Sequence, residues 1–136
     1  MPARSKARKR ALDLLFEAEV RGLPVLDLLA ERTAAADPPV SDYAAMLVRG
    51  VHEHAAQIDE LLAAYSKDWA LERMPAVDRN VLRIGAYELL WRDDIPDAVA
   101  ISEAVALAGD LSTDESPGFV NGLLGRLLQV RPSLAL

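Results

Sequence analysis

Apolar residues recur at intervals of three and four along almost the whole chain, and no segment shows a convincing alternation of the kind typical of β-strands. Ala and Leu dominate the apolar residues, while aromatic residues make up only 5% of the sequence. This composition favours helices that pack closely on other helices. A chain of 136 residues is long enough to bury a sizeable core within one domain. The sequence therefore predicts an all-α fold, a single-domain helical bundle that spans residues 1–136.

Prolines, glycines and capping residues divide this pattern into segments. Helices are expected over residues 5–20, 25–36, 77–92, 97–109 and 116–130, and over 41–65 with a bend or break near 50–54. Ser41 is suited to cap the third helix, and Ser116, followed by Pro117, is suited to cap the last. Residues 67–71 predict a short turn or 3₁₀ piece with Trp69 as a core anchor. Residues 1–4 and 131–136 are expected to be flexible.

The composition excludes several classes of site. The chain has no cysteine, which rules out disulfides, thiolate metal sites and a cysteine nucleophile. Its two histidines, His52 and His54, lie about 200° apart on a helix and cannot both face one metal ion. No apolar run approaches the roughly 18 residues that span a bilayer, and acidic residues at 13, 17 and 19 interrupt any signal-peptide core. We therefore expect a cytoplasmic protein, away from membranes, that is not an enzyme and has no cofactor or metal.

Three glycines, Gly118, Gly122 and Gly125, lie in one predicted helix. A glycine-rich loop that binds phosphate follows a β-strand, and no strand is predicted before them. Their spacing favours a helix face of small residues that another helix approaches closely. We therefore interpret them as a packing face.

Positive charge is concentrated at the N-terminus. The net charge is −6, yet the first ten residues carry five cations and no anion. These cations are Arg4, Lys6, Arg8, Lys9 and Arg10. Cations at the start of a helix oppose its macrodipole, so helix stability does not explain them, whereas phosphate polyanions attract such a cluster. The cluster therefore indicates local binding of nucleic-acid phosphates, with a solvated, frayed end as the alternative.

A second group, Arg79, Arg83 and Tyr87, advances by four residues along the predicted helix 77–92. Residues at this spacing share one helix face. One interpretation is a solvated face with ion pairs, for example between Arg83 and Glu88. The other is a docking surface for RNA or protein.

Segment 115–122 contains the predicted start of the last helix. Free backbone N–H groups at such a start are able to bind a phosphate. Phe119, in the first turn, is placed to stack on an unpaired base, which is how single-stranded RNA is usually bound. Ordinary core packing of Phe119 is equally compatible with the pattern.

Four segments resemble signatures of the NusB family of transcription antitermination factors, in order and at the right spacing. They are 7–12 (Ala-Arg-Lys-Arg-Ala-Leu), 81–89 (Val-Leu-Arg-Ile-Gly-Ala-Tyr-Glu-Leu), 99–105 (Val-Ala-Ile-Ser-Glu-Ala-Val) and 119–124 (Phe-Val-Asn-Gly-Leu-Leu). The resemblance covers about residues 4–130. It implies an all-α fold of about seven helices in two packed sub-bundles, without catalysis or a cofactor. It also implies binding of single-stranded boxA RNA in ribosomal RNA transcripts together with ribosomal protein NusE. Other Nus factors and RNA polymerase then join indirectly, and the polymerase reads through terminators.

The same resemblance implies roles for individual residues. RNA phosphates are expected to contact Arg4, Lys6, Arg8, Lys9 and Arg10, and the RNA is expected to meet Glu115, Ser116 and Phe119. The side that faces NusE is expected to include Asp78, Arg79 and Tyr87. The chain departs from many relatives before Phe119, where Pro117-Gly118 stands in place of a bulky or basic residue.

Two alternatives remain at the level of sequence. A related helical module occurs fused to ribosomal RNA cytosine methyltransferases, but this chain has no cysteine and ends near the bundle, so a free-standing factor is expected. The other alternative is a helical protein-interaction adaptor, or a homodimer in which the RNA site is occluded.

Overall fold

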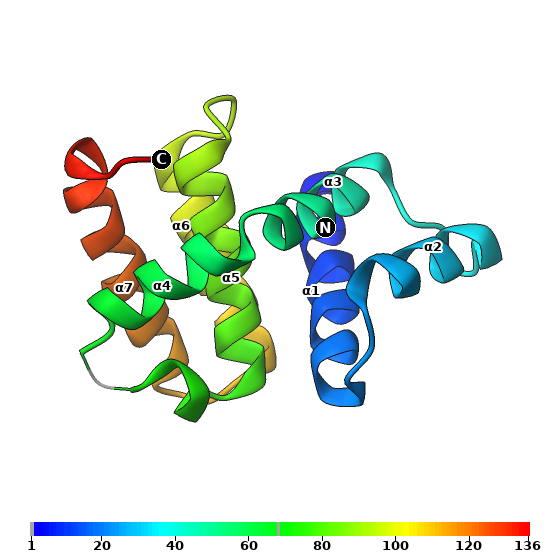
Figure 1. The fold of residues 1–136 in the computed structure, drawn as a ribbon, viewed down its shortest axis with the longest axis horizontal. Coiled ribbons are helices and arrows are strands. Elements are labelled where there is room, and N and C mark those ends of the chain that lie inside the picture. Colours follow the sequence, from blue (N-terminus) through cyan, green and yellow to red (C-terminus); the bar gives the residue numbers. More distant parts are fainter. Residues whose placement is uncertain (1, 68) are drawn as a thin grey trace.

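The structure, a computed structural model, describes residues 2–67 and 69–136. All regular secondary structure in these ranges is helical (Figure 1). Its α-helices are α1 (Ala3–Arg21), α2 (Val25–Ala35), α3 (Asp42–Glu53), α4 (Ala55–Tyr65), α5 (Ala76–Trp91), α6 (Asp97–Leu111) and α7 (Ser116–Val130). Two 3₁₀ turns, η1 (Leu71–Arg73) and η2 (Arg131–Ser133), complete the described chain. The predicted all-α class is confirmed. None of the helices in these ranges has the length and apolar character that a membrane crossing requires.

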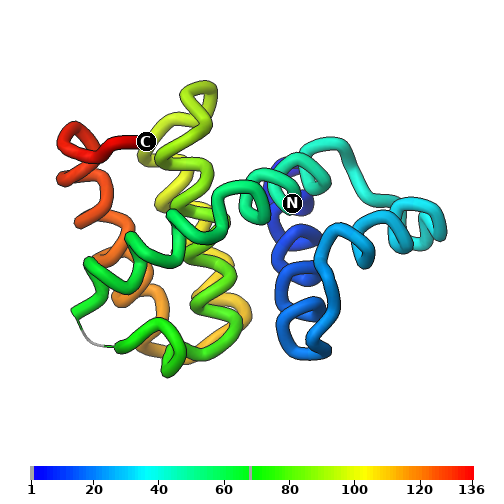
Figure 2. Tube along the Cα trace, in the orientation of Figure 1, coloured from blue at the N-terminus to red at the C-terminus, as the bar shows by residue number. Residues whose placement is uncertain are grey.

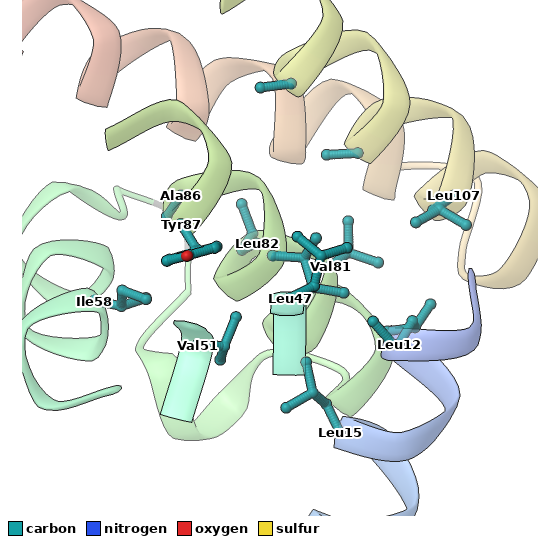
Figure 3. Packing of buried hydrophobic residues seen from close by; sticks show 14 of the residues in the cluster. Leu12, Leu15, Leu47, Val51, Ile58, Val81, Leu82, Ala86, Tyr87 and Leu107 are labelled. Carbon is teal, nitrogen blue, oxygen red and sulfur yellow. The ribbon is translucent and has the colours of Figure 1, made fainter. Parts of the chain in front are cut away.

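The helices form two sub-bundles, as predicted. Helices α1, α2 and α3 pack together on one side, and α4, α6 and α7 pack around α5 on the other. Helix α5 also packs against α1 and α3, so it belongs to both groups (Figures 1 and 2). One continuous apolar core runs through this shared helix. Side chains from α1, α3 and α5 converge there, as Leu12, Leu47 and Leu82 show (Figure 3).

Local signals in the sequence placed several boundaries correctly. The Ser41 side chain accepts a hydrogen bond from the Ala44 N–H at 3.2 Å, which confirms the predicted cap. The long segment 41–65 breaks at His54, between α3 and α4, where a bend or break was predicted. The predicted piece 67–71 is displaced, because the 3₁₀ turn is at Leu71–Arg73, and residue 68 lies outside the described residues.

The predicted capping role of Ser116 is wrong. Its hydroxyl does not bond the first N–H groups of α7, because it donates to Asp78 of α5 at 2.8 Å and accepts from the Thr113 N–H at 3.2 Å. Flexible ends were predicted for residues 1–4 and 131–136. At the first of these, α1 begins at Ala3, and residue 1 lies outside the described residues. At the second, Arg131 forms an ion pair with Asp97 at 2.7 Å.

The glycines that permit close helix packing are not those of α7. A Cβ added to Gly118 or Gly125 would meet no atom within 4 Å, and one on Gly122 would meet only the Arg126 side chain of the same helix, at 3.5 Å. The predicted packing face is therefore wrong. A Cβ on Gly50 of α3, in contrast, would lie 2.1 Å from the ring of Tyr87, and one on Gly85 would lie 2.8 Å from Leu124. The sites of close approach therefore lie on both sides of α5, where Tyr87 covers Gly50 and α7 crosses Gly85.

A buried ion pair joins the two sub-bundles. Arg8 of α1 donates two hydrogen bonds to Glu88 of α5, from Nε to Oε1 at 2.8 Å and from Nη2 to Oε2 at 2.9 Å. Arg8 is 2% exposed and Glu88 is 1% exposed. Tyr43 of α3 donates its hydroxyl to the same carboxylate, and Glu103 of α6 lies 3.3 Å from Arg8 Nη1. Four helices thus meet at one charged cluster.

The electrostatics of this cluster favour its ionised form. Burial alone would lower the pKa of Arg8, but the hydrogen bonds and the charge of Glu88 raise that pKa above its ordinary value. Burial and the hydrogen bond to Glu88 also raise the pKa of Tyr43. Arg8 therefore keeps its charge and Tyr43 keeps its proton across the physiological range, so Glu88 retains both donors.

Replacing Arg8 with Met should reduce the free energy of unfolding by about 3–5 kcal/mol, because Glu88 would remain buried without its counter-charge. The double variant Arg8→Met, Glu88→Leu should recover most of this loss, since it removes both charges. Urea denaturation of the single and double variants measures the difference. The matched control is Lys9→Met, which removes an exposed cation and should change stability by less than about 1 kcal/mol. An Arg8→Met protein as stable as the Lys9→Met protein would contradict the account.

Substitution Gly50→Ala should destabilise the protein by about 1–3 kcal/mol, because the new methyl group would overlap the buried Tyr87 ring. Substitution Gly125→Ala should be neutral or stabilising by up to about 1 kcal/mol, since it adds helix propensity in open space. Both are exchanges of Gly for Ala within a helix, so thermal unfolding of the pair separates packing from propensity. Equal shifts of the two midpoints would show that Tyr87 gives way at no cost.

Candidate nucleic-acid interface

The N-terminal cations occupy the first turns of α1, but they do not share one environment. Arg4 and Lys6 are exposed, and the Arg4 guanidinium lies 4.8 Å from the centre of the Tyr43 ring. Lys9 is about half exposed and makes only a weak ion pair with Asp13 at 3.5 Å, within the same helix. Arg10 is partly buried and donates to a backbone carbonyl of the α2–α3 loop. These four residues present positive charge at or near the surface.

Arg8 differs from these four residues, because its charge is committed to Glu88 inside the molecule. The sequence pattern grouped it with the other cations, and the structure places it on the inner face of the same helix. Its side chain holds α1 against α5, and the neighbouring cations project from the helix that it fixes. A charge reversal at Arg8 would therefore place a second carboxylate beside Glu88 and test folding rather than RNA contact.

The loop between α6 and α7 is tied to α5 by a buried polar cluster. Asp78 is fully buried and accepts hydrogen bonds from the hydroxyls of Ser112 and Ser116. Ser116 is also fully buried and bonds Thr113. From the family resemblance, Ser116 was expected to contact RNA and Asp78 to face a protein partner. The structure brings the two side chains together in the interior, where they fix the loop that carries Asp114 and Glu115.

Phe119 meets Trp69 beside this loop. The Phe119 side chain is only 9% exposed, and its ring lies edge to face with Trp69, with 4.8 Å between ring centres and 67° between planes. Trp69 is partly buried and less enclosed than Phe119. The two rings, Gly118 and the acidic residues Asp114 and Glu115 line a cavity of about 520 Å³. The burial of Phe119 favours its interpretation as a core residue over that of a base-stacking residue. Trp69 is the more accessible of the two aromatic side chains.

The face that carries Arg79, Arg83 and Tyr87 is largely occupied by contacts within the protein. Arg79 makes two hydrogen bonds to Glu19 of α1, at 3.0 and 2.6 Å, and Arg83 pairs with Asp59 at 2.8 Å and with Glu19 at 2.7 Å. The predicted pairing of Arg83 with Glu88 is wrong, because Glu88 pairs with Arg8. Tyr87 is buried, 7% exposed.

The Glu19 network also fixes the chain just after Trp69. Arg79 donates from Nη1 to the carbonyl oxygens of Leu71 and Met74, both at 2.9 Å. Burial alone would raise the pKa of Glu19, but hydrogen bonds from Arg79 and Arg83 lower it below the ordinary value. Glu19 therefore stays ionised at neutral pH, and the turn that follows Trp69 is held by a charged network.

Sequence reasoning missed two features of this region. Trp69 was identified only as a core anchor, because nothing local in the sequence shows that its partner is Phe119. Glu103 was not singled out, although it accepts a hydrogen bond from Ser5 at 2.7 Å and lies against Arg8, so that it attaches the basic end of α1 to α6. The only available signal was the position of Glu103 within the motif at 99–105.

The arrangement offers binding groups rather than reactive ones. An exposed cationic helix end suits phosphate oxygens, and an aromatic cavity with hydrogen-bond acceptors suits an unpaired base. Among the described residues, no group of three His, Asp or Glu side chains is placed to hold a metal ion. The sequence-based expectation of phosphate and base contacts is therefore compatible with the groups that this surface presents.

Comparisons with known proteins agree with this geometry. The sequence model of the NusB family matches residues 5–129. The chain is 64% identical to the transcription antitermination protein NusB of Nocardioides sp., over 99% of this chain and all of that protein. A structure of T. maritima NusB superposes with a TM-score of 0.83 at 35% identity, covering 95% of this chain and 92% of that one. A crystal structure of antitermination factors NusB and NusE in complex with double-stranded RNA gives a TM-score of 0.81 at 25% identity, covering 93% and 96%. The chain belongs to the NusB family.

Proposed function

We propose that this chain is a non-enzymatic antitermination factor, a single RNA-binding domain over residues 1–136 that binds boxA RNA of ribosomal transcripts together with NusE. Membership of the NusB family supports the role, and the related NusB–NusE–RNA complex supports both partners. The other Nus factors and RNA polymerase would then join this complex, and the polymerase would read through terminators. The observation that carries the proposal is the exposed cationic start of α1, which a buried ion pair fixes to the rest of the fold.

The cations would act through phosphate contacts. Lys6 and Lys9 project from α1 into solvent, and Arg4 and Arg10 flank them. Such contacts release counterions and supply affinity, but they carry little sequence information. Beyond the first ten residues the chain is strongly acidic, with 10 basic and 21 acidic residues. RNA is therefore attracted to this end of the molecule and repelled elsewhere.

The partner NusE would use another part of the surface. Asp78 and Tyr87 are buried, so their contribution to a NusE contact would be to position neighbouring groups. Arg79 is more accessible, because it lines a shallow hollow with Glu19, Leu71 and Glu72. Glu72 is exposed and acidic, and a basic ribosomal protein would complement that charge. Joining the two binding sites in one complex would raise the affinity for RNA beyond that of either site.

The variants Lys6→Glu and Lys9→Glu should each weaken RNA binding and lower the slope of log affinity against log salt by about 0.7 per lost phosphate contact. Fluorescence anisotropy with boxA and scrambled RNA, in single-stranded and double-stranded form, measures this at several salt concentrations. Addition of NusE should increase the preference for boxA. Both variants should unfold at nearly the wild-type midpoint, since these side chains are solvated.

The matched control is Arg49→Glu, which reverses an exposed cation on α3 outside the cluster. It changes the net charge by the same amount and should leave the salt slope as it is in the wild type. An equal loss in all three variants would mean that only net charge matters. If NusE binds the wild type and the variants equally well and neither RNA binds, the alternative of a protein-interaction adaptor or homodimer would be favoured.

A further inference from the structure

We propose that Ser5 of α1 is a phosphorylation site, and that a phosphoryl group on its hydroxyl switches off the cationic end of that helix. The proposal rests on the proposed RNA-binding function and adds a means of regulating it. It follows from three properties of Ser5, which are a partly exposed position, a basic neighbourhood and a hydrogen bond to a carboxylate on another helix.

Ser5 lies in the part of α1 that opens most easily. Residues 2–6 are exposed or partly exposed, and the buried residues of the helix begin at Ala7. Unwinding the first turn therefore exposes no core side chain, and segments without buried contacts open at little cost in free energy. The Ser5 hydroxyl donates to Glu103 Oε1 at 2.7 Å, and this bond breaks when the turn opens. A kinase can thus reach the hydroxyl while the rest of α1 stays in place.

The sequence around Ser5 is basic on both sides. The cations within four residues of it are Arg4, Lys6, Arg8 and Lys9, and the first acidic residue of the chain comes later in the helix. An opened segment with this charge complements an acidic substrate groove. The modifying enzyme is therefore a serine kinase of the class that selects basic sequences.

A phosphoryl group at this position would occupy cations that RNA needs. It carries a charge of about −1.5 to −2 at neutral pH and three strong acceptor oxygens. Lys9 lies one turn after Ser5 on the same helix face, and its ion pair with Asp13 is long, at 3.5 Å. Arg4 is adjacent and exposed. Both cations would pair with a phosphoryl group of the same chain, so an RNA phosphate would have to displace an intramolecular partner.

Glu103 adds a second effect. Its Oε1 accepts from Ser5 and lies 3.3 Å from Arg8 Nη1, and its side chain is only 27% exposed. Phosphoserine has no hydroxyl proton to donate, and it would place a second anion beside this carboxylate, where like charges repel. The first turn of α1 would therefore separate from α6, while Arg8 keeps its two bonds to Glu88 in the interior. The modification thus acts on the RNA-binding end and leaves the fold intact.

The transfer requires only the Ser5 hydroxyl from this chain. Its oxygen attacks the γ-phosphorus of a nucleoside triphosphate held by the kinase, so that an O–P bond forms and the bond from that phosphorus to the β–γ bridging oxygen breaks. The nucleoside diphosphate leaves, and the hydroxyl proton passes to the carboxylate base of the kinase. Hydrolysis by a phosphatase adds water, releases inorganic phosphate and restores the hydroxyl, so the switch is reversible.

The first test compares RNA binding by the wild type, by Ser5→Glu and by the full chain with phosphoserine incorporated genetically at position 5. Loss of about one phosphate contact in Ser5→Glu should weaken binding of boxA RNA about fivefold at about 0.1 M salt and lower the salt slope by about 0.7. Phosphoserine, with about twice the charge, should weaken binding about 20- to 30-fold and lower the slope by about 1.4. Equal affinity of the three proteins would refute the switch.

Two control variants separate the added charge from other causes. Ser5→Ala removes the hydrogen bond to Glu103 without adding a charge, and Ser102→Glu adds the same charge at an exposed position of α6. Both should bind RNA within about twofold of the wild type, because exposed charges outside the cluster are screened. A loss in either control as large as that in Ser5→Glu would refute the proposal, since the hydroxyl or the net charge alone would then explain the effect.

The second test determines whether the modification occurs on the protein in its own cells, during growth and in stationary phase. Cleavage before Asp13 releases a peptide of residues 1–12, in which Ser5 is the only residue with a hydroxyl group. The mass of this peptide therefore reports phosphorylation at a single atom. A phosphorylated fraction that differs between the two phases is expected, and a peptide that is unmodified in both would overturn the proposal.

The outcomes separate this inference from the proposed function. Wild-type binding of RNA that phosphoserine at position 5 leaves unchanged would refute the switch alone. Absence of RNA binding by the wild-type protein would refute the proposed function and, with it, the switch.

Discussion

The contact between Arg8 and Glu88 fixes α1, and with it the exposed cations of that helix, against the rest of the fold. A guanidinium and a carboxylate, both almost fully buried, are matched by two hydrogen bonds, with Tyr43 and Glu103 beside them. Such a pair contributes little net stability compared with apolar side chains, but leaving one partner alone is costly. Its effect is on geometry, because the two hydrogen bonds between Arg8 and Glu88 form only when α1 is correctly oriented against α5. The exposed cations of α1 are then presented at a fixed position rather than on a frayed end.

Helix α5 organises the remainder of the site. Its first turns carry Asp78 and Arg79, which hold the α6–α7 loop and the turn after Trp69, and its later part carries Glu88 and Tyr87. The cationic helix and the aromatic cavity are thus two independent surfaces attached to one buried element. The motif around residues 81–89, which marks the family in the sequence, is for the most part a scaffold in this structure.

Much of the fold was predictable because its signals are local. Ser41 caps a helix through its own hydroxyl three residues away, and the break near His54 follows from the sequence around it. The burial of Arg8 was not predictable in this way, since its partner lies 80 residues further along the chain. The same holds for Ser116 and Asp78, which are separated by 38 residues, and for the close approach of Tyr87 to Gly50. Residue type predicts phosphate binding by the N-terminal cations, and only long-range pairing shows which of these cations remain accessible for it.

The most direct test of this account is a solution NMR titration of the protein with a short boxA-like RNA, following the side chains of α1 and the indole N–H of Trp69. The account predicts that the signals of Lys6, Lys9 and Trp69 shift with added RNA, while the Arg8 Nε–H signal stays in place and protected from exchange, as its bond to Glu88 requires. A shift of the Arg8 Nε–H together with loss of its protection, or unchanged Lys6 and Lys9 signals at saturating RNA, would contradict it.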